Sequence, residues 1–295
     1  MKSAPFTYCR PASVTEACAL LAADEDARLI AGGQTLVPMM AMRLARPTAL
    51  IDIARIPELA FVRREGDHIE IGAATRQAFA EANATVALDL PLLARALPWI
   101  GHSAIRNRGT IGGSIANADP AAEIPLVLAT LGGAVVVQTP RGRERFAARD
   151  FFLGPMTTAI PADGCLVEAH FPVWTHQRIG ACFTEISARH GDFAYVSAAA
   201  QVALDDNGSC VACALGVGGA TAQPTQLAVD LTGARINETT AREKLSVAIE
   251  TLDMMTDPHA SPAYRKRAAL ALALRALLAA RDEALAKRAR TGKCY

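Results

Sequence analysis

Two short glycine-rich segments have the residue types and the spacing to bind an anion. The first is residues 31–35 (AGGQT), between an expected strand and an expected helix. Adjacent glycines accept positive φ and allow another group to approach the backbone closely. The amide groups at the start of the helix would then point outward and favour a negative charge such as a pyrophosphate. Taken alone, the segment is explained equally well by a tight turn that binds nothing.

The second segment is residues 109–114 (GTIGGS), which lie much farther along the chain. Two backbone nests of this kind could hold the two ends of one diphosphate. A carboxylate of Asp119 or Glu123 would either cap the helix expected next or accept a hydrogen bond from a ribose or ribityl hydroxyl. The nearby Arg106 and Arg108 either balance phosphate charge or are solvated loop charges.

Other familiar nucleotide-binding and catalytic patterns are absent from the sequence. Neither glycine segment is G-x-G-x-x-G or carries the Gly-Lys-Ser/Thr of a P-loop, which argues against a doubly wound NAD-binding domain and an ATPase. No G-x-S-x-G serine motif occurs. The six histidines lie far apart in the sequence without a metal-type pair, so we expect no metal site. From position alone, His102 and His190 are interpreted as hydrogen-bonded structural residues.

The seven cysteines are scattered, and Cys210 and Cys213 form the only C-x-x-C pair. Residues three apart on a strand face opposite sides, which predicts buried thiols rather than a shared metal ion. The spacing of a plant-type iron–sulfur cluster is also absent. Any iron–sulfur chemistry would therefore come from another chain.

The 295 residues suffice for two domains, and 51% hydrophobic with 20% charged residues is ordinary for a globular protein. The 30 basic and 29 acidic side chains nearly cancel, so nucleic acid is not an expected partner. The first residues lack the apolar core of a signal peptide. The most apolar helical stretch, residues 268–280, is interrupted by Arg275 and is too short to span a bilayer. We expect a cytoplasmic protein without a membrane span.

The hydrophobic pattern predicts alternating helices and strands over the first 171 residues. The expected helices are 15–23 after a Ser13 cap, 35–44, 75–83, 90–97 and one that opens at 119–123 and runs to 131. The expected strands are 28–31, 49–53, 68–71, 134–138, 151–152 and 166–171. Residues 172–178 are expected to form a linker.

After that linker, the pattern changes to strands followed by helices. Strands at 194–204 and 211–217 would flank a hairpin turn at 205–208. A helix with a capping box of Thr240 and Glu243 would follow, and a last helix would run from Ser261-Pro262 towards Arg290. The last third is therefore predicted to be an antiparallel sheet packed on helices.

Three motifs in this order carry a family resemblance. Residues 31–59 (AGGQTLVPMMAMRLARPTALIDIARIPEL), 105–125 (IRNRGTIGGSIANADPAAEIP) and 188–193 (ARHGDF) resemble the signatures of FAD-binding medium subunits of molybdenum hydroxylases. The similarity extends from the opening F-x-Y at residues 6–8 to the final helix. It implies an α+β fold: a vanillyl-alcohol-oxidase-like (PCMH-type) FAD domain, residues 1–175, with subdomains of about 1–57 and 58–175, then a carbon monoxide dehydrogenase flavoprotein C-terminal-like domain, residues 179–290.

The resemblance also implies which residues meet the cofactor. The backbone of residues 31–35 and 110–114 would hold the FAD pyrophosphate, Asp119 would contact the sugar-like portion, and the backbone at Leu166 would meet the ring system. Phe193 stands where some relatives have Tyr beside the isoalloxazine; it could stack without donating a hydrogen bond, or be a core aromatic. No catalytic residue is expected, and the implied cofactor-binding residues are Ala31, Gly32, Gly33, Gln34, Thr35, Leu36, His102, Ile105, Gly109, Thr110, Gly112, Gly113, Ser114, Asn117, Asp119, Leu166 and Phe193.

By the same resemblance, this chain would be one part of an enzyme of three subunits. A large subunit with molybdopterin cytosine dinucleotide would hydroxylate the substrate with water, and a small subunit with two 2Fe–2S clusters would relay electrons. FAD in this chain would pass them to an external acceptor: a quinone, a cytochrome, NAD or oxygen. The complex would be a dimer of heterotrimers, acting on carbon monoxide, an aldehyde, a purine or an N-heteroaromatic compound. Two alternatives remain: a free-standing FAD oxidase of the same fold, and a non-enzymatic nucleotide-binding or assembly protein.

Overall fold

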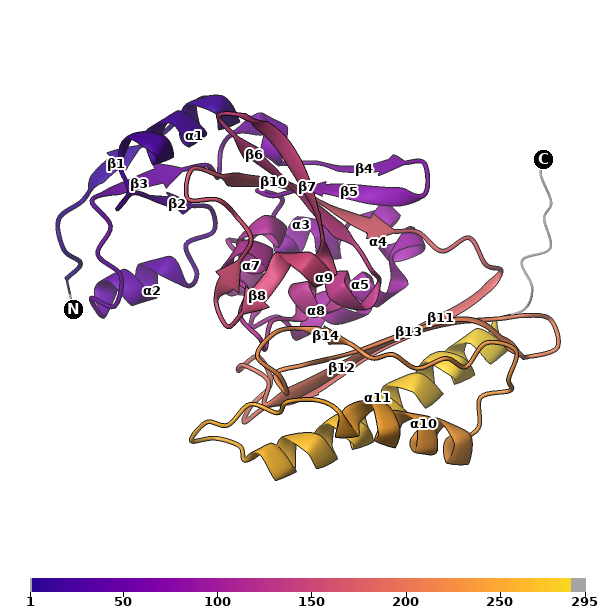
Figure 1. Cartoon of the computed structure of the whole chain (residues 1–295). Coiled ribbons are helices and arrows are strands. Elements are labelled where there is room, and N and C mark those ends of the chain that lie inside the picture. Colours follow the sequence, from indigo (N-terminus) through magenta and orange to yellow (C-terminus); the bar gives the residue numbers. More distant parts are fainter. Residues whose placement is uncertain (1, 288–295) are drawn as a thin grey trace.

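The computed structural model of this chain describes residues 2–287, which form three main sheets with helices between and around them (Figure 1). Cys294 and the expected extension of the last helix to Arg290 lie outside the described residues. Within the described part of the chain, no helix combines the length and apolar character needed to cross a membrane.

The N-terminal lobe is a parallel three-stranded sheet with two helices. The strand order is β1 (Thr7–Cys9), β3 (Ala49–Asp52) and β2 (Arg28–Ile30). Helix α1 (Val14–Ala23) begins as predicted, because the Ser13 hydroxyl accepts a hydrogen bond from the amide of Glu16 at 3.2 Å. Helix α2 (Leu36–Ala41) follows the first glycine segment directly, so the lobe presents that segment at the end of a strand.

The middle of the chain is an antiparallel sheet of five strands. Their order is β4 (Val62–Glu65), β5 (His68–Gly72), β10 (Cys165–Pro172), β6 (Ala134–Thr139) and β7 (Gly142–Ala147). One face of this sheet packs on helices α5 (Pro91–Ala96), α7 (Ile111–Asn117) and α8 (Glu123–Thr130), and together they form the largest hydrophobic core. On the other face, α1 packs against β6 and β10.

Short elements complete this part of the chain and connect its layers. They are the 3-10 turns Pro57–Leu59 and Leu97–Trp99, the helices α3 (Gln77–Glu81), α4 (Ala84–Asp89), α6 (Ser103–Arg106) and α9 (Ala148–Phe151), and the strands β8 (Phe152–Gly154) and β9 (Thr157–Thr158).

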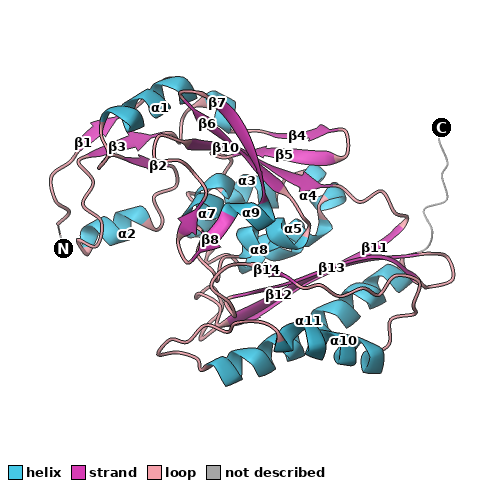
Figure 2. Ribbon diagram, in the orientation of Figure 1, coloured by secondary structure: helices cyan, strands magenta, loops and turns pink. Residues whose placement is uncertain are grey.

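The C-terminal part is a four-stranded antiparallel sheet that is covered on both faces (Figure 2). Its strands are β11 (Arg178–Ile186), β12 (Val196–Leu204), β13 (Cys210–Gly218) and β14 (Thr225–Gln226). Helices α10 (Glu238–Glu250) and α11 (Pro262–Ala286) pack on one side, and α5 and α8 meet the other. Every residue of β12 is buried as a result. The predicted α+β architecture is confirmed.

Two local predictions about the C-terminal part are wrong. The expected linker included Arg178, but Arg178 begins the nine-residue strand β11, whose sequence was not recognised as a strand. The expected capping box of Thr240 and Glu243 does not start α10. The cap is Asn237, whose side-chain oxygen accepts a hydrogen bond from the Thr240 amide at 2.9 Å.

The predicted orientation of Cys210 and Cys213 on opposite faces is also wrong. The pairing of β12 with β13 shifts by one residue between Leu204↔Cys210 and Ala203↔Ala212, which is a β-bulge at Val211. The bulge places both cysteines on one face of the strand. Their thiols share a hydrogen bond, and this bond together with burial raises the pKa of Cys213.

Candidate functional site

The first glycine turn presents unpaired amide groups to the outside. Gly33 has φ of +71°, a conformation that favours glycine. Within residues 2–287, the amides of Gln34, Thr35 and Leu36 find no hydrogen-bond acceptor, and the Thr35 side chain makes no cap bond at the start of α2. Unpaired donors at a helix start attract an anion, so the geometry suits one end of a diphosphate.

The second glycine turn is different because its amides are already paired. Thr110 caps α7, and its hydroxyl accepts a hydrogen bond from the Gly113 amide at 2.9 Å. The amides of Ile111 and Gly112 donate to the carbonyls of Thr75 and Ala73 at 2.9 and 3.0 Å. Ser114 donates its amide to the Thr110 carbonyl at 3.1 Å. This turn therefore packs firmly against the end of β5.

One glycine of the second turn, Gly112, is required by that packing. A Cβ atom on Gly112 would lie 2.4 Å from the Ala73 Cβ, and one on Gly109 would lie 2.5 Å from Oε1 of Gln77. Contacts this short do not occur between real side chains, and the obstacle at position 112 includes the backbone of Ala73 at the end of β5, so the chain must carry glycine there for α7 to meet the sheet. At position 109 the obstacle is the end of the flexible Gln77 side chain, which could move.

The two turns touch each other, although they come from different lobes. A Cβ atom on Gly32 would lie 2.5 Å from the Arg108 carbonyl oxygen and 2.8 Å from Gly109 Cα. A Cβ atom on Gly113 would lie 3.9 Å from that of Ala31. The structure thus brings the two predicted segments side by side, with the free amides of the first next to the packed backbone of the second.

Two guanidinium groups stand beside this contact. The Arg76 guanidinium donates to the Arg108 carbonyl, and its pKa is lowered by burial and by the nearby charge of Arg108. Arg108 itself is exposed. In contrast, Arg106 is paired with Glu81 at 2.7 Å and donates to the Ile100 carbonyl at 2.9 Å, so it has a structural role. Arg76 was missed because a single arginine before a helix carries no sequence signal.

A cavity of about 510 Å³ opens between the start of α8 and the C-terminal part. It contains Asp119, whose Oδ1 accepts a hydrogen bond from the Ala121 amide at 2.9 Å. Phe193 lines the same cavity and is 72% exposed, which excludes the interpretation as a core aromatic. The cavity is lined by Asp119, Pro120, Ala121, Ala188, Gly191, Asp192, Phe193, Ala194, Tyr195, Gly219, Met255, Asp257, His259 and Arg265.

The loop that carries Phe193 is anchored on the segment before the second turn. Gly191 has φ of +88°, and a Cβ there would lie 2.9 Å from Cε1 of His102. The His190 ring stacks on Trp99 with centroids 5.7 Å apart. His102 is exposed and precedes α6, while Ile105 packs against Gly101. The predicted residues His102, Asp119 and Phe193 therefore approach one region from separate elements.

Arg265 holds the far wall of the cavity and was not predicted from the sequence. It is only 2% exposed, donates to the carbonyls of Tyr195 and Gly219, and pairs with Asp257 at 2.5 Å. Arg265 lies on the alanine- and leucine-rich helix α11, whose residues were not among the predicted site residues. The signal available was a charged residue on the apolar side of that helix.

Leu166 and Asn117 lie behind the second turn rather than in the cavity lining. The Leu166 side chain is buried in the main core, and the neighbouring Val167 carbonyl accepts from the Ala73 amide at 2.8 Å. Ala73 accepts in turn from Gly112, so β10 supports the turn through two backbone hydrogen bonds. The Asn117 amide contacts the Met156 sulfur at 3.7 Å.

The histidines include one pair that the sequence did not reveal. The rings of His68 and His170 stack with centroids 4.7 Å apart, because β5 and β10 are neighbours in the sheet. Their separation along the chain hid this contact. The prediction that the histidines form no metal-type pair was made from their spacing in the sequence, which does not show contacts between paired strands.

Comparison with known families accounts for nearly all of the described chain. Residues 4–174 match the family described as "FAD binding domain in molybdopterin dehydrogenase". Residues 181–280 match the "CO dehydrogenase flavoprotein C-terminal domain". Both glycine turns and the start of α8 lie in the first match, and the Phe193 loop and Arg265 lie in the second.

Individual relatives match over most of their length. The chain is 39% identical over 272 residues to the 6-hydroxypseudooxynicotine dehydrogenase complex subunit alpha of Paenarthrobacter nicotinovorans, covering 90% of each protein. It is also 39% identical over 207 residues to the carbon monoxide dehydrogenase medium chain of Hydrogenophaga pseudoflava, covering 70% and 71%. The crystal structure of quinoline 2-oxidoreductase from Pseudomonas putida 86 contains a chain that matches this one with a TM-score of 0.91 and 35% identity. The match covers 97% of this chain and 100% of that chain.

Proposed function

Because this chain belongs to the family of FAD-binding medium subunits of molybdenum hydroxylases, we propose that it is the electron-transfer subunit of a heterotrimeric oxidoreductase. In this proposal, electrons arrive from 2Fe–2S clusters of a small subunit and leave to an external acceptor. A large subunit with molybdopterin cytosine dinucleotide would perform the substrate chemistry, and two heterotrimers would form a dimer.

The residues present fit an FAD molecule. The unpaired amides of residues 34–36 would bind the diphosphate, and Arg76 and Arg108 would balance its charge. Asp119 has the acceptor chemistry for ribose or ribityl hydroxyls, and the exposed ring of Phe193 offers a stacking surface for the flavin. Within the second turn, the packed backbone would form a wall rather than a set of donors.

Bound FAD would supply the conversion between single-electron and two-electron transfer, which no side chain of this protein can provide. The chain's own residues bind the phosphates, orient the ring and limit the access of water. We therefore assign no acid–base residue to this subunit. The substrate would be selected in the large subunit, since identity is 39% both to a 6-hydroxypseudooxynicotine dehydrogenase subunit and to a carbon monoxide dehydrogenase chain.

The observation that carries this proposal is the contact of Gly32 with Arg108 and Gly109, which places unpaired amides beside two guanidinium groups. The first test is purification of the native complex, identification of its chains and metals, and addition of candidate substrates from the four classes named above. Substrate should bleach the flavin absorbance of the complex, and the isolated chain with FAD should not react.

Two outcomes would replace this proposal. Substrate turnover by the isolated, FAD-loaded chain would favour a free-standing oxidase. A chain that purifies without partners and takes up no FAD would favour a nucleotide-binding or assembly role. A cytoplasmic location, in which the six described thiols remain reduced, is part of the proposal.

A further inference from the structure

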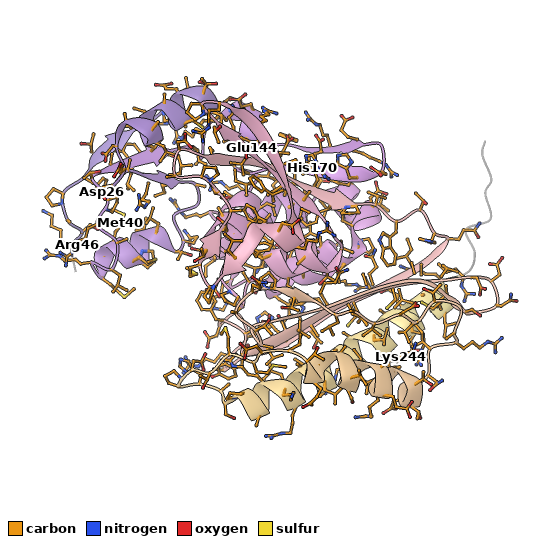
Figure 3. All side chains as sticks on the ribbon, in the orientation of Figure 1. Asp26, Met40, Arg46, Glu144, His170 and Lys244 are labelled. Atoms are coloured by element: carbon orange, nitrogen blue, oxygen red, sulfur yellow. The ribbon has the colours of Figure 1, made fainter. Side chains whose placement is uncertain are left out.

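A polar cluster lies on the outer face of the five-stranded sheet, away from the flavin site. Strand β5 carries the sequence His68-Ile69-Glu70, and β10 carries the reversed sequence Glu168-Ala169-His170. Side chains two apart share a face of a strand, and the antiparallel register places Glu70 directly opposite His170. The intervening Ile69 and Ala169 are fully buried on the opposite face. Figure 3 labels His170 on this sheet, far from Lys244 of α10.

Three candidate ligand atoms converge within the cluster. Nε2 of His68 lies 3.2 Å from Oε1 of Glu70, and Nε2 of His170 lies 3.6 Å from the same oxygen. All three atoms lie within 4.8 Å of one another. Bonds of about 2.0–2.1 Å in a tetrahedral zinc site place neighbouring ligand atoms about 3.3 Å apart. The two nitrogen–oxygen separations are close to this spacing. The two stacked imidazole rings would have to turn so that both Nε2 lone pairs point at one ion.

Neighbouring residues orient these ligands as they do in metal sites. Nδ1 of His68 lies 3.0 Å from Oδ1 of Asp67, and a hydrogen bond from Nδ1 to this carboxylate leaves Nε2 with a free lone pair. Arg63 holds the other oxygen of Glu70 at 2.5 Å, which turns Oε1 towards the histidines. Oε1 of Glu168 lies 3.1 Å from Nε2 of His170 and can serve as a fourth ligand.

The charges of the cluster call for an additional cation. Three carboxylates face it from Asp67, Glu70 and Glu168, against the two guanidiniums of Arg63 and Arg145. Each Nε2 atom lies against a carboxylate oxygen, so a proton or a metal ion must stand between them. Three of the four side chains that meet here, Glu70, Glu168 and His170, are each only 8% exposed, which makes an unbalanced charge costly.

A small opening connects the cluster to solvent. A cavity of about 100 Å³ is lined by Asp67, His68, Gly132, Gly133, Arg145, His170 and Pro172. Since a water molecule takes a share of about 30 Å³, this space has room for a water ligand that would complete the coordination sphere. It shares no lining residue with the larger cavity that contains Asp119 and Phe193.

We propose that His68, Glu70 and His170, with Glu168 as a further ligand, bind one divalent transition-metal ion of the zinc class. Imidazole nitrogen favours zinc and its neighbours in the first transition series, whereas magnesium and calcium favour all-oxygen sites. The ion would cross-link β5 and β10, the strands that support the second glycine turn. This proposal departs from the sequence-based expectation of no metal site, and it does not depend on the proposed function.

The test is a zinc titration of the tag-free chain after treatment with a chelator, followed by isothermal titration calorimetry in a non-coordinating buffer. The wild-type chain should bind one Zn²⁺, and Zn²⁺ should raise its melting temperature because the ion binds only the folded state. His68→Gln and His170→Gln should each weaken binding about 100-fold or more, and Asp67→Asn about tenfold. Exposed His176, in the connection between β10 and β11, gives the matched control His176→Gln, which should bind as the wild type does.

The double variant His68→Gln/His170→Gln separates loss of the site from loss of the fold. Its circular dichroism spectrum and its melting temperature without zinc should match those of the wild-type chain after chelation. Unchanged zinc binding by this double variant would assign the ion to cysteines or other residues and would overturn the proposal. Failure of the folded wild-type chain to bind one equivalent of zinc would overturn it as well.

Discussion

The two glycine turns have similar sequences but use their backbones in opposite ways. In the first, the amides of residues 34–36 have no acceptor within residues 2–287. In the second, the amides of residues 111–114 are paired with Ala73, Thr75 and Thr110. Glycine in the first turn allows positive φ and a close approach, whereas glycine in the second leaves room for the sheet. The difference teaches that a glycine pair marks a tight approach, and that only the hydrogen-bond partners show whether a ligand is expected.

The largest effect should come from the packed turn. Gly112→Ala places a methyl group 2.4 Å from the Ala73 Cβ, so α7 must move away from β5. We expect a loss of about 3 kcal/mol in the free energy of unfolding, at the upper end for overpacking. Urea unfolding of the FAD-free chain measures this loss. A variant as stable as the wild type would mean that the second turn is not held by packing.

Gly32→Ala should act mainly on the ligand. The added methyl group meets the Arg108 carbonyl at 2.5 Å and separates the two turns where the diphosphate would lie. We expect FAD affinity to fall about 100-fold, or about 2.7 kcal/mol. Quenching of flavin fluorescence in an equilibrium titration gives the affinity. If the loss in the free energy of FAD binding were no larger than the loss in the free energy of unfolding of the FAD-free chain, the contact would have no special role in binding.

The unpaired carboxyl group of Glu185 should affect the stability of the chain, whereas the unpaired amides of the first turn should affect FAD binding. Glu185 is buried on β11 with no partner for either oxygen within the described residues, and burial with nearby Glu123 raises its pKa to about 8. The folded chain thus keeps its proton above the ordinary value of 4.5, and stability is lost as pH rises towards 8. Glu185→Gln should remove on the order of 2 kcal/mol of this loss between roughly pH 5 and pH 7.

Urea unfolding of the FAD-free chain at both pH values, with and without the substitution, measures whether stability falls as the pH rises. The wild-type chain should be the more stable at the lower pH, and the variant should show a flatter dependence. An equal pH dependence in the two proteins would show that Glu185 is solvated or paired.

Arg108→Gln should have a smaller effect that depends on salt. The exposed guanidinium would contribute charge to diphosphate binding, so its loss should weaken FAD binding about tenfold at low ionic strength and less at high salt. The matched control is Arg106→Gln, because Arg106 is bound to Glu81 and Ile100. The control should lower stability without changing the salt dependence of FAD binding. A reversed pattern would assign the phosphate charge to Arg106.

The smallest effects come from the two threonines that precede the helices. Thr110→Val removes the acceptor for the Gly113 amide and should cost about 1 kcal/mol of stability. Thr35→Val removes no cap bond of α2 and should leave the stability of the FAD-free chain unchanged. Thermal unfolding of both variants tests the contrast directly. Equal losses would indicate that Thr35 caps its helix in solution.

The glycine turns, the main strands and the two-part architecture could be predicted because their signals are local. Glycine pairs, apolar runs and caps such as Ser13 are read within a few residues of the chain. The pairing of the second turn could not be predicted, because its acceptors Ala73 and Thr75 belong to a different segment. The roles of Arg76 and Arg265 were hidden for the same reason, since a single arginine shows its partners only after folding.

The pairing register of the strands explains the other differences between the predictions and the structure. One extra residue at Val211 reverses the expected facing of Cys210 and Cys213, and no residue type in this strand announces the bulge. His68 and His170 meet only because β10 inserts between β5 and β6. The mirrored His-x-Glu and Glu-x-His sequences were available as a signal, but they become informative only when the two strands are paired.

The most direct measurement compares FAD with riboflavin, which lacks the diphosphate, in equilibrium titrations of the isolated FAD-free chain. We expect one FAD per chain, bound at least 1,000-fold (about 4 kcal/mol) more tightly than riboflavin, and a much smaller ratio in Gly32→Ala. Equal affinities for the two flavins, or no uptake of FAD in excess by the folded chain, would contradict a diphosphate site at the first glycine turn.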